Sequence, residues 1–227
     1  MLTTSLQLFT ITFFLLSGGS MDTKQIHWLG HSAFRIEDES VQLYFDPYKL
    51  SAKLPKADII FITHSHYDHY SQEDIAKIKK DGTIFVAPSD VVLQIGKGAI
   101  VVSPGTETTV GRLHIRAVPA YNLNKNFHPK NKQWVGYIIT LSNGHKIYHA
   151  GDTDNIPEMR TISADIALLP CGGTYTMTAQ EAAAAANIFK PKVVIPMHWG
   201  DIIGSKSDAT DLQKLFSGET IIKSQER

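Results

Sequence analysis

The chain has 227 residues, of which 43% are apolar, with 22 basic and 22 acidic side chains and a single cysteine, Cys171. This composition is typical of a globular protein and excludes a disordered tail or a disulfide-stapled scaffold. The balanced charge lacks the basic footprint of a general nucleic-acid or anionic-membrane binder. We therefore expect a small-molecule substrate and no nucleic-acid partner.

Residues 1–20 carry no charge, and their apolar run from Leu6 to Leu16 has the length of a signal-peptide core. The run is too short to span a bilayer. No Lys or Arg precedes it, and Met21 stands just before the first strand-like segment. Two interpretations stay open: a leader that directs export, or an N-terminal extension ahead of a cytoplasmic protein that starts at Met21. We expect one domain over 21–227.

Short runs rich in Val, Ile, Phe and Tyr recur along the chain and predict strands. The dipeptide Asn143-Gly144 between two of them is a strong hairpin signal. The predicted strands are 26–29, 33–37, 41–45, 58–63, 83–87, 99–103, 112–120, 133–141, 145–150, 165–170, 192–197 and 219–223.

Helices are indicated by their capping residues. Ser71, with Asp74 three residues later, predicts a helix that stops at Gly82. Thr178 with Glu181 predicts a helix over 179–189, and Ser207 predicts a third helix that ends before Gly218. Hairpins early in the chain and strand-helix-strand units later favour a layered α/β domain, with any site built at strand ends.

The predicted strand 58–63 runs directly into a segment with four metal-binding side chains within six residues, His64, His66, Asp68 and His69. On an extended strand end, His64 and His66 project from the same face and can hold one metal ion. Asp68 and His69 follow as the chain turns toward the next helix, on another side of the same pocket. Buried and unpaired, these groups would be costly, so the segment predicts a site for two divalent cations.

The segment Thr63 to His69 resembles the signature of the metallo-β-lactamase superfamily. Four further segments resemble its branch of lactonase-like and N-acyl-phosphatidylethanolamine phospholipase D-like hydrolases: Gly30-His31-Ser32, Asp46-Pro47, Gly151-Asp152-Thr153-Asp154 and Pro196-Met197-His198-Trp199-Gly200. The resemblance covers about residues 24–223. It implies a four-layer αββα sandwich of two mixed sheets, with a dinuclear site at the edge where the sheets meet.

The resemblance also implies the ligands. His64 and His66 would bind the first ion, Asp68, His69 and His198 the second, and Asp152 both. Members of the superfamily usually add a His at the strand end where this chain has Asn122. The alternatives for this missing ligand are His128, His31, His149 and the carbonyl oxygen of Asn122 itself.

With these ligands the chain is expected to be a hydrolase that uses a metal-bound hydroxide to cleave a small ester, lactone, amide or phosphodiester. Zinc suits the imidazoles best, with nickel, manganese and iron as alternatives. Asp68 would also orient the nucleophile and relay its proton. Asp46 would fix a ligand imidazole from behind, Thr174 and Tyr175 would offer hydroxyls to the substrate, and Tyr67 and Trp199 would wall the pocket.

Two other functions compete with hydrolysis of a small molecule. A metal-dependent nuclease would carry an added basic module, and no segment of the sequence looks like one. A degenerate scaffold that binds metal or a ligand as a sensor is favoured by the missing His at Asn122. His27, His114 and His145 lie within or beside strand runs and are expected to take no part in the site.

Overall fold

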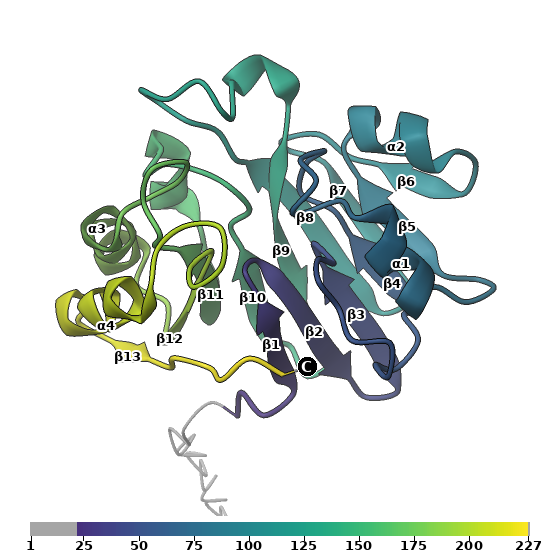
Figure 1. Cartoon of the computed structure of the whole chain (residues 1–227), viewed down its shortest axis with the longest axis horizontal. Helices are drawn as coiled ribbons and strands as arrows, with labels where there is room; N and C mark the ends of the chain where they lie inside the picture. The colour runs from purple at the N-terminus through teal and green to yellow at the C-terminus, as the bar shows by residue number, and fades with distance from the viewer. Residues whose placement is uncertain (1–21, 227) are drawn as a thin grey trace, which may run out of the picture.

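The computed structural model describes residues 22–226, which form two mixed β-sheets packed face to face. Helices α1 and α2 lie outside one sheet, and α3 and α4 lie outside the other (Figure 1). The predicted αββα sandwich is therefore confirmed. The expectation of a leader or an N-terminal extension concerns residues 1–20, which fall outside the described part of the chain.

The first sheet has the strand order β1-β2-β3-β4-β5-β6. Its first three strands are antiparallel neighbours, and β3 to β6 run parallel to one another. The strands are β1 (Ile26–Gly30), β2 (Ala33–Asp38), β3 (Val41–Phe45), β4 (Ile59–Phe61), β5 (Ile84–Ala87) and β6 (Ala99–Val101).

The second sheet has the order β13-β12-β11-β10-β9-β8-β7, with β10 to β13 parallel and the other pairs antiparallel. Its strands are β7 (Glu107–Val110), β8 (Leu113–Pro119), β9 (Val135–Thr140), β10 (Lys146–His149), β11 (Ile166–Pro170), β12 (Val193–Met197) and β13 (Glu219–Thr220). Strand β7 was not predicted, because its sequence Glu-Thr-Thr-Val is largely polar. The strand predicted over 219–223 is only two residues long.

The helices are α1 (Gln72–Ile78), α2 (Ser89–Ile95), α3 (Ala179–Phe189) and α4 (Lys206–Leu215), with short 3-10 turns η1 (Lys130–Lys132) and η2 (Pro157–Thr161). Ser71 caps α1 and Thr178 caps α3, as predicted. Two expectations about helices are wrong, because α1 ends at Ile78 rather than reaching Gly82 and α4 is capped by Ser205 rather than Ser207. Helix α2, which has no side-chain cap, was not predicted.

Alternation along the central strands explains why the first sheet is covered on both faces. Leu43 and Phe45 of β3 point into the core between the sheets, whereas Tyr44 points to the layer under α1 and α2. Strand β4 repeats this pattern, with Phe61 between the sheets and Ile60 under the helices. Each sheet is thus buried by its partner sheet on one side and by helices on the other.

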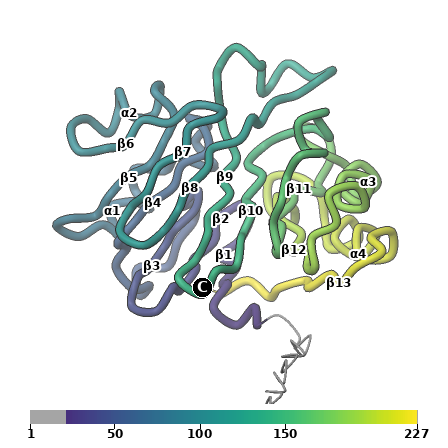
Figure 2. The backbone as a smooth tube through the Cα atoms, turned by 180° about the vertical axis from the view of Figure 1, so that it is seen from behind, coloured from purple at the N-terminus to yellow at the C-terminus, as the bar shows by residue number. Residues whose placement is uncertain are grey.

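The last residues of the chain return to its beginning (Figure 2), where the segment after β13 runs past β1. Glu226 donates its backbone N–H to the carbonyl of Trp28, and Gln225 donates its side-chain amide to the carbonyl of Leu29. These two hydrogen bonds tie β1, the edge strand of the first sheet, to the segment that follows β13, the edge strand of the second sheet. Within residues 22–226, no helix combines the length and the apolar character needed to cross a membrane.

Candidate metal centre

All six side chains expected to bind metal meet at one edge of the sandwich, where several strands have their carboxyl ends. The loop after β4 carries four of them, and Asp152 and His198 directly follow β10 and β12. Because β10 to β12 are parallel neighbours, their carboxyl ends lie at the same edge. The full set is His64, His66, Asp68, His69, Asp152 and His198.

Asp152 lies at the centre of this group. Its Oδ2 is 3.0 Å from Nε2 of His198 and 3.2 Å from Nε2 of His128, and its Oδ1 is 3.2 Å from Nε2 of His69. The three histidines come from three separate loops. One carboxylate therefore faces imidazoles from distant parts of the chain.

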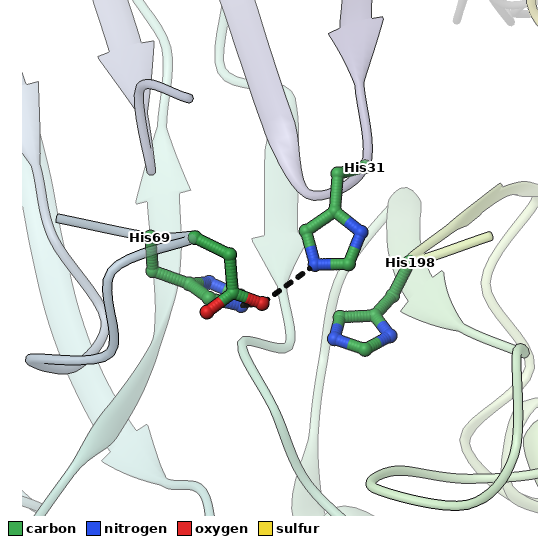
Figure 3. A group of neighbouring side chains, drawn as sticks. His31, His69 and His198 are labelled. Carbon is green, nitrogen blue, oxygen red and sulfur yellow. Dashed lines mark hydrogen bonds and ion pairs between the residues drawn. The ribbon is translucent and has the colours of Figure 1, made fainter. Parts of the chain in front are cut away.

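The potential ligand atoms fall into overlapping groups in which all of these atoms lie within 4.8 Å of one another. One group is His64, His66 and His128, and another is His31, Asp68, His69 and His198. A third joins His64 and His69 to Asp152. Figure 3 shows His31, His69 and His198 of the second group converging on one space. Asp152 contacts a member of each of the first two groups, which is the position that a carboxylate shared by two ions requires.

Unpaired polar atoms test whether these residues suit divalent ions. Nε2 of His69, Nε2 of His128 and Oδ1 of Asp152 are buried and make no well-aligned hydrogen bond, although both imidazole nitrogens lie 3.2 Å from the Asp152 carboxylate. Leaving such atoms unpaired in the interior is costly, and coordination to a cation would satisfy all three. Imidazole nitrogens and carboxylate oxygens are also the donors that zinc and related metals prefer. The donor set fits a divalent metal.

His128 lies where the missing imidazole is needed, and Asn122 holds it there. The side-chain oxygen of Asn122 accepts hydrogen bonds from the backbone N–H and from Nδ1 of His128, each at 3.0 Å. That leaves Nε2 of His128 to face Asp152. The Asn122 amide nitrogen donates to Asp154 and to the carbonyl of Tyr175, each at 3.0 Å. Asn122 thus contacts His128 rather than the cluster itself.

The other two histidines considered for the missing ligand, His149 and His31, make different contacts. His149 uses Nε2 on the carbonyl of Ser32, at 2.9 Å, and Nδ1 accepts from the backbone N–H of Gly151. With both nitrogens engaged, His149 is not available as a ligand. His31 donates from Nε2 to Oδ2 of Asp68 at 3.0 Å (Figure 3), so it supports a carboxylate of the cluster.

Asp46 contacts His69 on the side of the ring away from Asp152. Its carboxylate is fully buried and accepts from the backbone N–H of Thr63 at 2.8 Å, from the Thr63 hydroxyl at 2.7 Å and from Nδ1 of His69 at 2.7 Å. The bond to Nδ1 fixes the His69 ring and turns Nε2 toward Asp152. Such outer contacts orient metal ligands.

Three residues around the cluster have an unusual backbone conformation that could not be predicted from the sequence. His31, Asp46 and His198 all have left-handed φ values, of 50°, 44° and 57°. Non-glycine residues rarely adopt this conformation, which is concentrated at functional sites. The backbone of Gly172 also packs closely against the backbone of His198. A Cβ atom on Gly172 would lie 2.2 Å from the carbonyl oxygen of His198.

Both carboxylates of the cluster are held in the ionised form. Burial works to raise the pKa of Asp68, but the hydrogen bond from His31 and the nearby His69 outweigh it and lower that pKa to about 2. Burial also opposes ionisation of Asp152, yet the surrounding imidazoles, His198 and His69 first among them, bring its pKa well below the usual range. Metal binding needs deprotonated ligands, and these two carboxylates meet that need.

A cavity of about 250 Å³ opens onto the cluster. Its lining consists of His66, Tyr67, Asp68, Phe127, His128, Asp152, Tyr175, His198 and Ile202. Tyr67 and Tyr175 were expected here, whereas Thr174 is not among the lining residues. Trp199 stacks on Trp28, with ring centroids 4.6 Å apart, and lines a neighbouring cavity instead.

Two residues of this pocket, Phe127 and Ile202, were missed from the sequence. Phe127 directly precedes His128 and Ile202 follows the His198 turn, so adjacency to candidate ligands was the available signal. His27, His114 and His145 take no part in the metal-binding groups of the described residues, in line with the expectation for them.

Comparison with known proteins agrees with this geometry. Residues 25–198 match the family described as the beta-lactamase superfamily domain. A UPF0173 metal-dependent hydrolase from Lawsonia intracellularis is 34% identical over 191 residues, covering 77% of this chain and 83% of that protein. Another, from Thermococcus onnurineus, is 34% identical over 212 residues and covers 84% and 91% of the two chains.

Solved structures show the same fold. A candidate metal-dependent hydrolase from Parabacteroides distasonis superposes with a TM-score of 0.80 at 33% identity, covering 88% of this chain and 93% of that one. Igni18, a metallo hydrolase from Ignicoccus hospitalis, has a TM-score of 0.72 at 27% identity and covers 89% and 95%. The likeness to a lactonase or phospholipase branch stays a prediction. The chain belongs to the β-lactamase superfamily, among the UPF0173 metal-dependent hydrolases, and is a metal-dependent hydrolase.

Proposed function

We propose that the hydrolase is dinuclear. In this assignment His64, His66 and His128 hold one ion, Asp68, His69 and His198 hold the other, and Asp152 contacts both. The observation that carries the proposal is the position of Asp152, whose two oxygens face imidazoles of both groups at 3.0–3.2 Å.

Two divalent ions held side by side supply a nucleophile at neutral pH and polarise the carbonyl or phosphoryl group to be attacked. The chain's own contribution is to orient the reactants. Asp68 lines the pocket, is ionised, and is fixed by the hydrogen bond from His31. It can therefore accept a proton from the attacking water and return it to the leaving group.

Zinc is the ion that we propose, because five of the seven proposed ligands are imidazoles. Nickel, manganese and iron share enough of this preference to be tested beside it. The pocket, at about 250 Å³, suits a small-molecule ester, lactone, amide or phosphodiester.

The proposal is tested by measuring metal content and turnover on the same protein. Zinc-loaded enzyme should contain about two ions per chain and cleave members of an ester, lactone, amide and phosphodiester panel, with activity lost to a chelator and restored by zinc. His128→Ala should lower the metal content toward one ion, whereas His114→Ala, on an exposed strand position, should not. A fully loaded protein that cleaves no substrate in the panel would favour the sensor function instead.

A further inference from the structure

Part of the cavity lining consists of aromatic and aliphatic side chains that are not candidate metal ligands. Beside the candidate ligands the cavity is lined by Tyr67, Phe127, Tyr175 and Ile202. These residues come from four separate loops. Tyr67 is 66% exposed and Phe127 is 46% exposed, whereas most large apolar side chains of the described residues are buried.

The aromatic walls contact one another. The rings of Phe127 and Tyr175 meet edge to face with centroids 4.6 Å apart. Tyr67 meets Tyr48 in the same manner at 6.0 Å. Edge-to-face pairs hold aromatic rings in defined positions, so these rings form a fixed apolar surface at the mouth of the site.

Positive side chains are missing from this mouth. None of the residues that line the cavity is Lys or Arg within the described part of the chain. Two lysines in neighbouring loops are paired with carboxylates, since Lys49 bonds Asp201 and Lys125 bonds Asp154. Lys132 lies over the ring of Trp134, 5.8 Å from its centroid, and neither residue lines the cavity. A second anionic group on the substrate would therefore meet no cationic side chain on these walls, only the neutral hydroxyls of Tyr67 and Tyr175.

Two free-energy terms, burial of apolar surface and desolvation of charge, determine which substrate groups these walls favour. Covering the exposed rings with apolar groups removes apolar surface from water and is favourable. Placing a charged group against the same rings costs free energy because its hydration is lost without compensation. Charge on the substrate can be met only at the metal end of the cavity.

We propose, on the basis of the hydrolase function above, that the substrate is a neutral ester or lactone with an apolar aromatic or alkyl group beside the scissile bond. Phe127 and Tyr175 contact that group and determine specificity. The scissile carbonyl lies at the metal end of the cavity, and the apolar group lies between the rings.

A matched pair of substrates tests the proposal. p-Nitrophenyl hexanoate and mono-p-nitrophenyl adipate have the same leaving group, the same scissile bond and the same chain length, and differ in one terminal carboxylate. Zinc-loaded enzyme should cleave the hexanoate with a kcat/KM at least about tenfold higher, because the carboxylate loses hydration and finds no cationic partner on the walls. Equal values, or a preference for the adipate, would overturn the proposal.

Variants of Phe127 assign the effect to the walls. Phe127→Ala should raise KM for the hexanoate about five- to tenfold and leave kcat within about twofold, because one apolar contact is lost from binding. Phe127→Leu should restore most of the binding. Leu93→Ala, at a position 85% exposed on α2 and away from the cavity, is the control and should change neither constant. A loss of kcat with unchanged KM in Phe127→Ala would contradict the assigned role.

A binding measurement separates failure of this inference from failure of the hydrolase function. 4-Phenyl-2-butanone is a neutral aryl ketone that cannot be hydrolysed, and its binding to zinc-loaded protein can be measured by calorimetry. Binding should weaken in Phe127→Ala and stay unchanged in Leu93→Ala. Equal affinity for wild type and Phe127→Ala would refute the inference. Phe127-dependent binding without chelator-sensitive cleavage of either ester would refute the hydrolase function alone.

Discussion

Replacing Asn122 by alanine should weaken metal binding without removing any candidate ligand. The side-chain oxygen of Asn122 accepts both the backbone N–H and Nδ1 of His128, and all of these groups are buried. In Asn122→Ala both donors lose their acceptor, and the His128 ring loses the contact that turns Nε2 toward Asp152.

The size of the effect follows from these bonds. A buried donor left unpaired costs about 1–3 kcal/mol, so with two donors affected the free energy of unfolding should fall by roughly 2–6 kcal/mol. Loss of an outer contact to a metal-binding His typically lowers metal affinity about 10- to 100-fold, and we expect a change in that range for the ion held by His128.

The assay is competition for zinc against a chromophoric chelator, with urea unfolding on the same samples. Asn187→Ala is a matched control, because Asn187 also accepts two hydrogen bonds, from Ser217, and donates one, to the carbonyl of Leu215. It lies at the end of α3, away from the cluster, and should lower stability only. Wild-type zinc affinity in Asn122→Ala would refute the reasoning that Asn122 positions His128.

Three further changes test other parts of the account. Asp68→Ala should lose nearly all hydrolysis and bind about one ion fewer, because it removes both a ligand and the proton acceptor; initial rates and metal analysis measure this. Gly172→Ala should lower both thermal stability and zinc affinity, since its Cβ would lie 2.2 Å from the carbonyl oxygen of His198; calorimetry with and without zinc measures both. Asp74→Asn should remove the share of the acid-dependent stability that Asp74 contributes. Burial opposes ionisation of Asp74, but Lys77 and backbone N–H groups lower its pKa in the folded protein. The stabilisation is therefore present above about pH 4, the pKa of an unfolded Asp, and is lost as pH falls further; urea unfolding at several pH values checks it.

Each of these predictions has a clear contrary result. Asp68→Ala with wild-type rates would show that another group moves the proton. Gly172→Ala with unchanged stability would mean that the loop after β11 shifts freely to admit the methyl group. An Asp74→Asn protein that keeps the wild-type loss of stability below about pH 4 would place that dependence on other carboxylates.

The sequence predicted most of the sheet strands because their residues alternate between two buried faces. Strand β3 shows why, since Phe45 and Tyr44 both had to be apolar to contact different layers. Helices with side-chain caps were found, but α2 begins after Pro88 with no such cap and gave no signal. Short polar β7 was missed because pairing with β8, rather than its own pattern, makes it a strand.

In the candidate site too, some residues could be predicted from the sequence and others could not. His64 to His69 could be predicted because the ligands are adjacent in sequence, and Asp152 and His198 because each follows a β-rich run. The hydrogen bond between Asn122 and His128 could not be singled out, because five loop residues lie between them and several histidines were available. The left-handed backbone at His198 depends on packing and has no local signature.

In the proposed dinuclear centre, side chains from separate loops hold two ions with Asp152 between them. Anomalous diffraction at the zinc edge, on crystals of zinc-loaded protein, tests this arrangement. We expect two peaks per chain, one beside His64, His66 and His128 and the other beside Asp68, His69 and His198. A single peak, or a first ion that His128 does not contact, would contradict it.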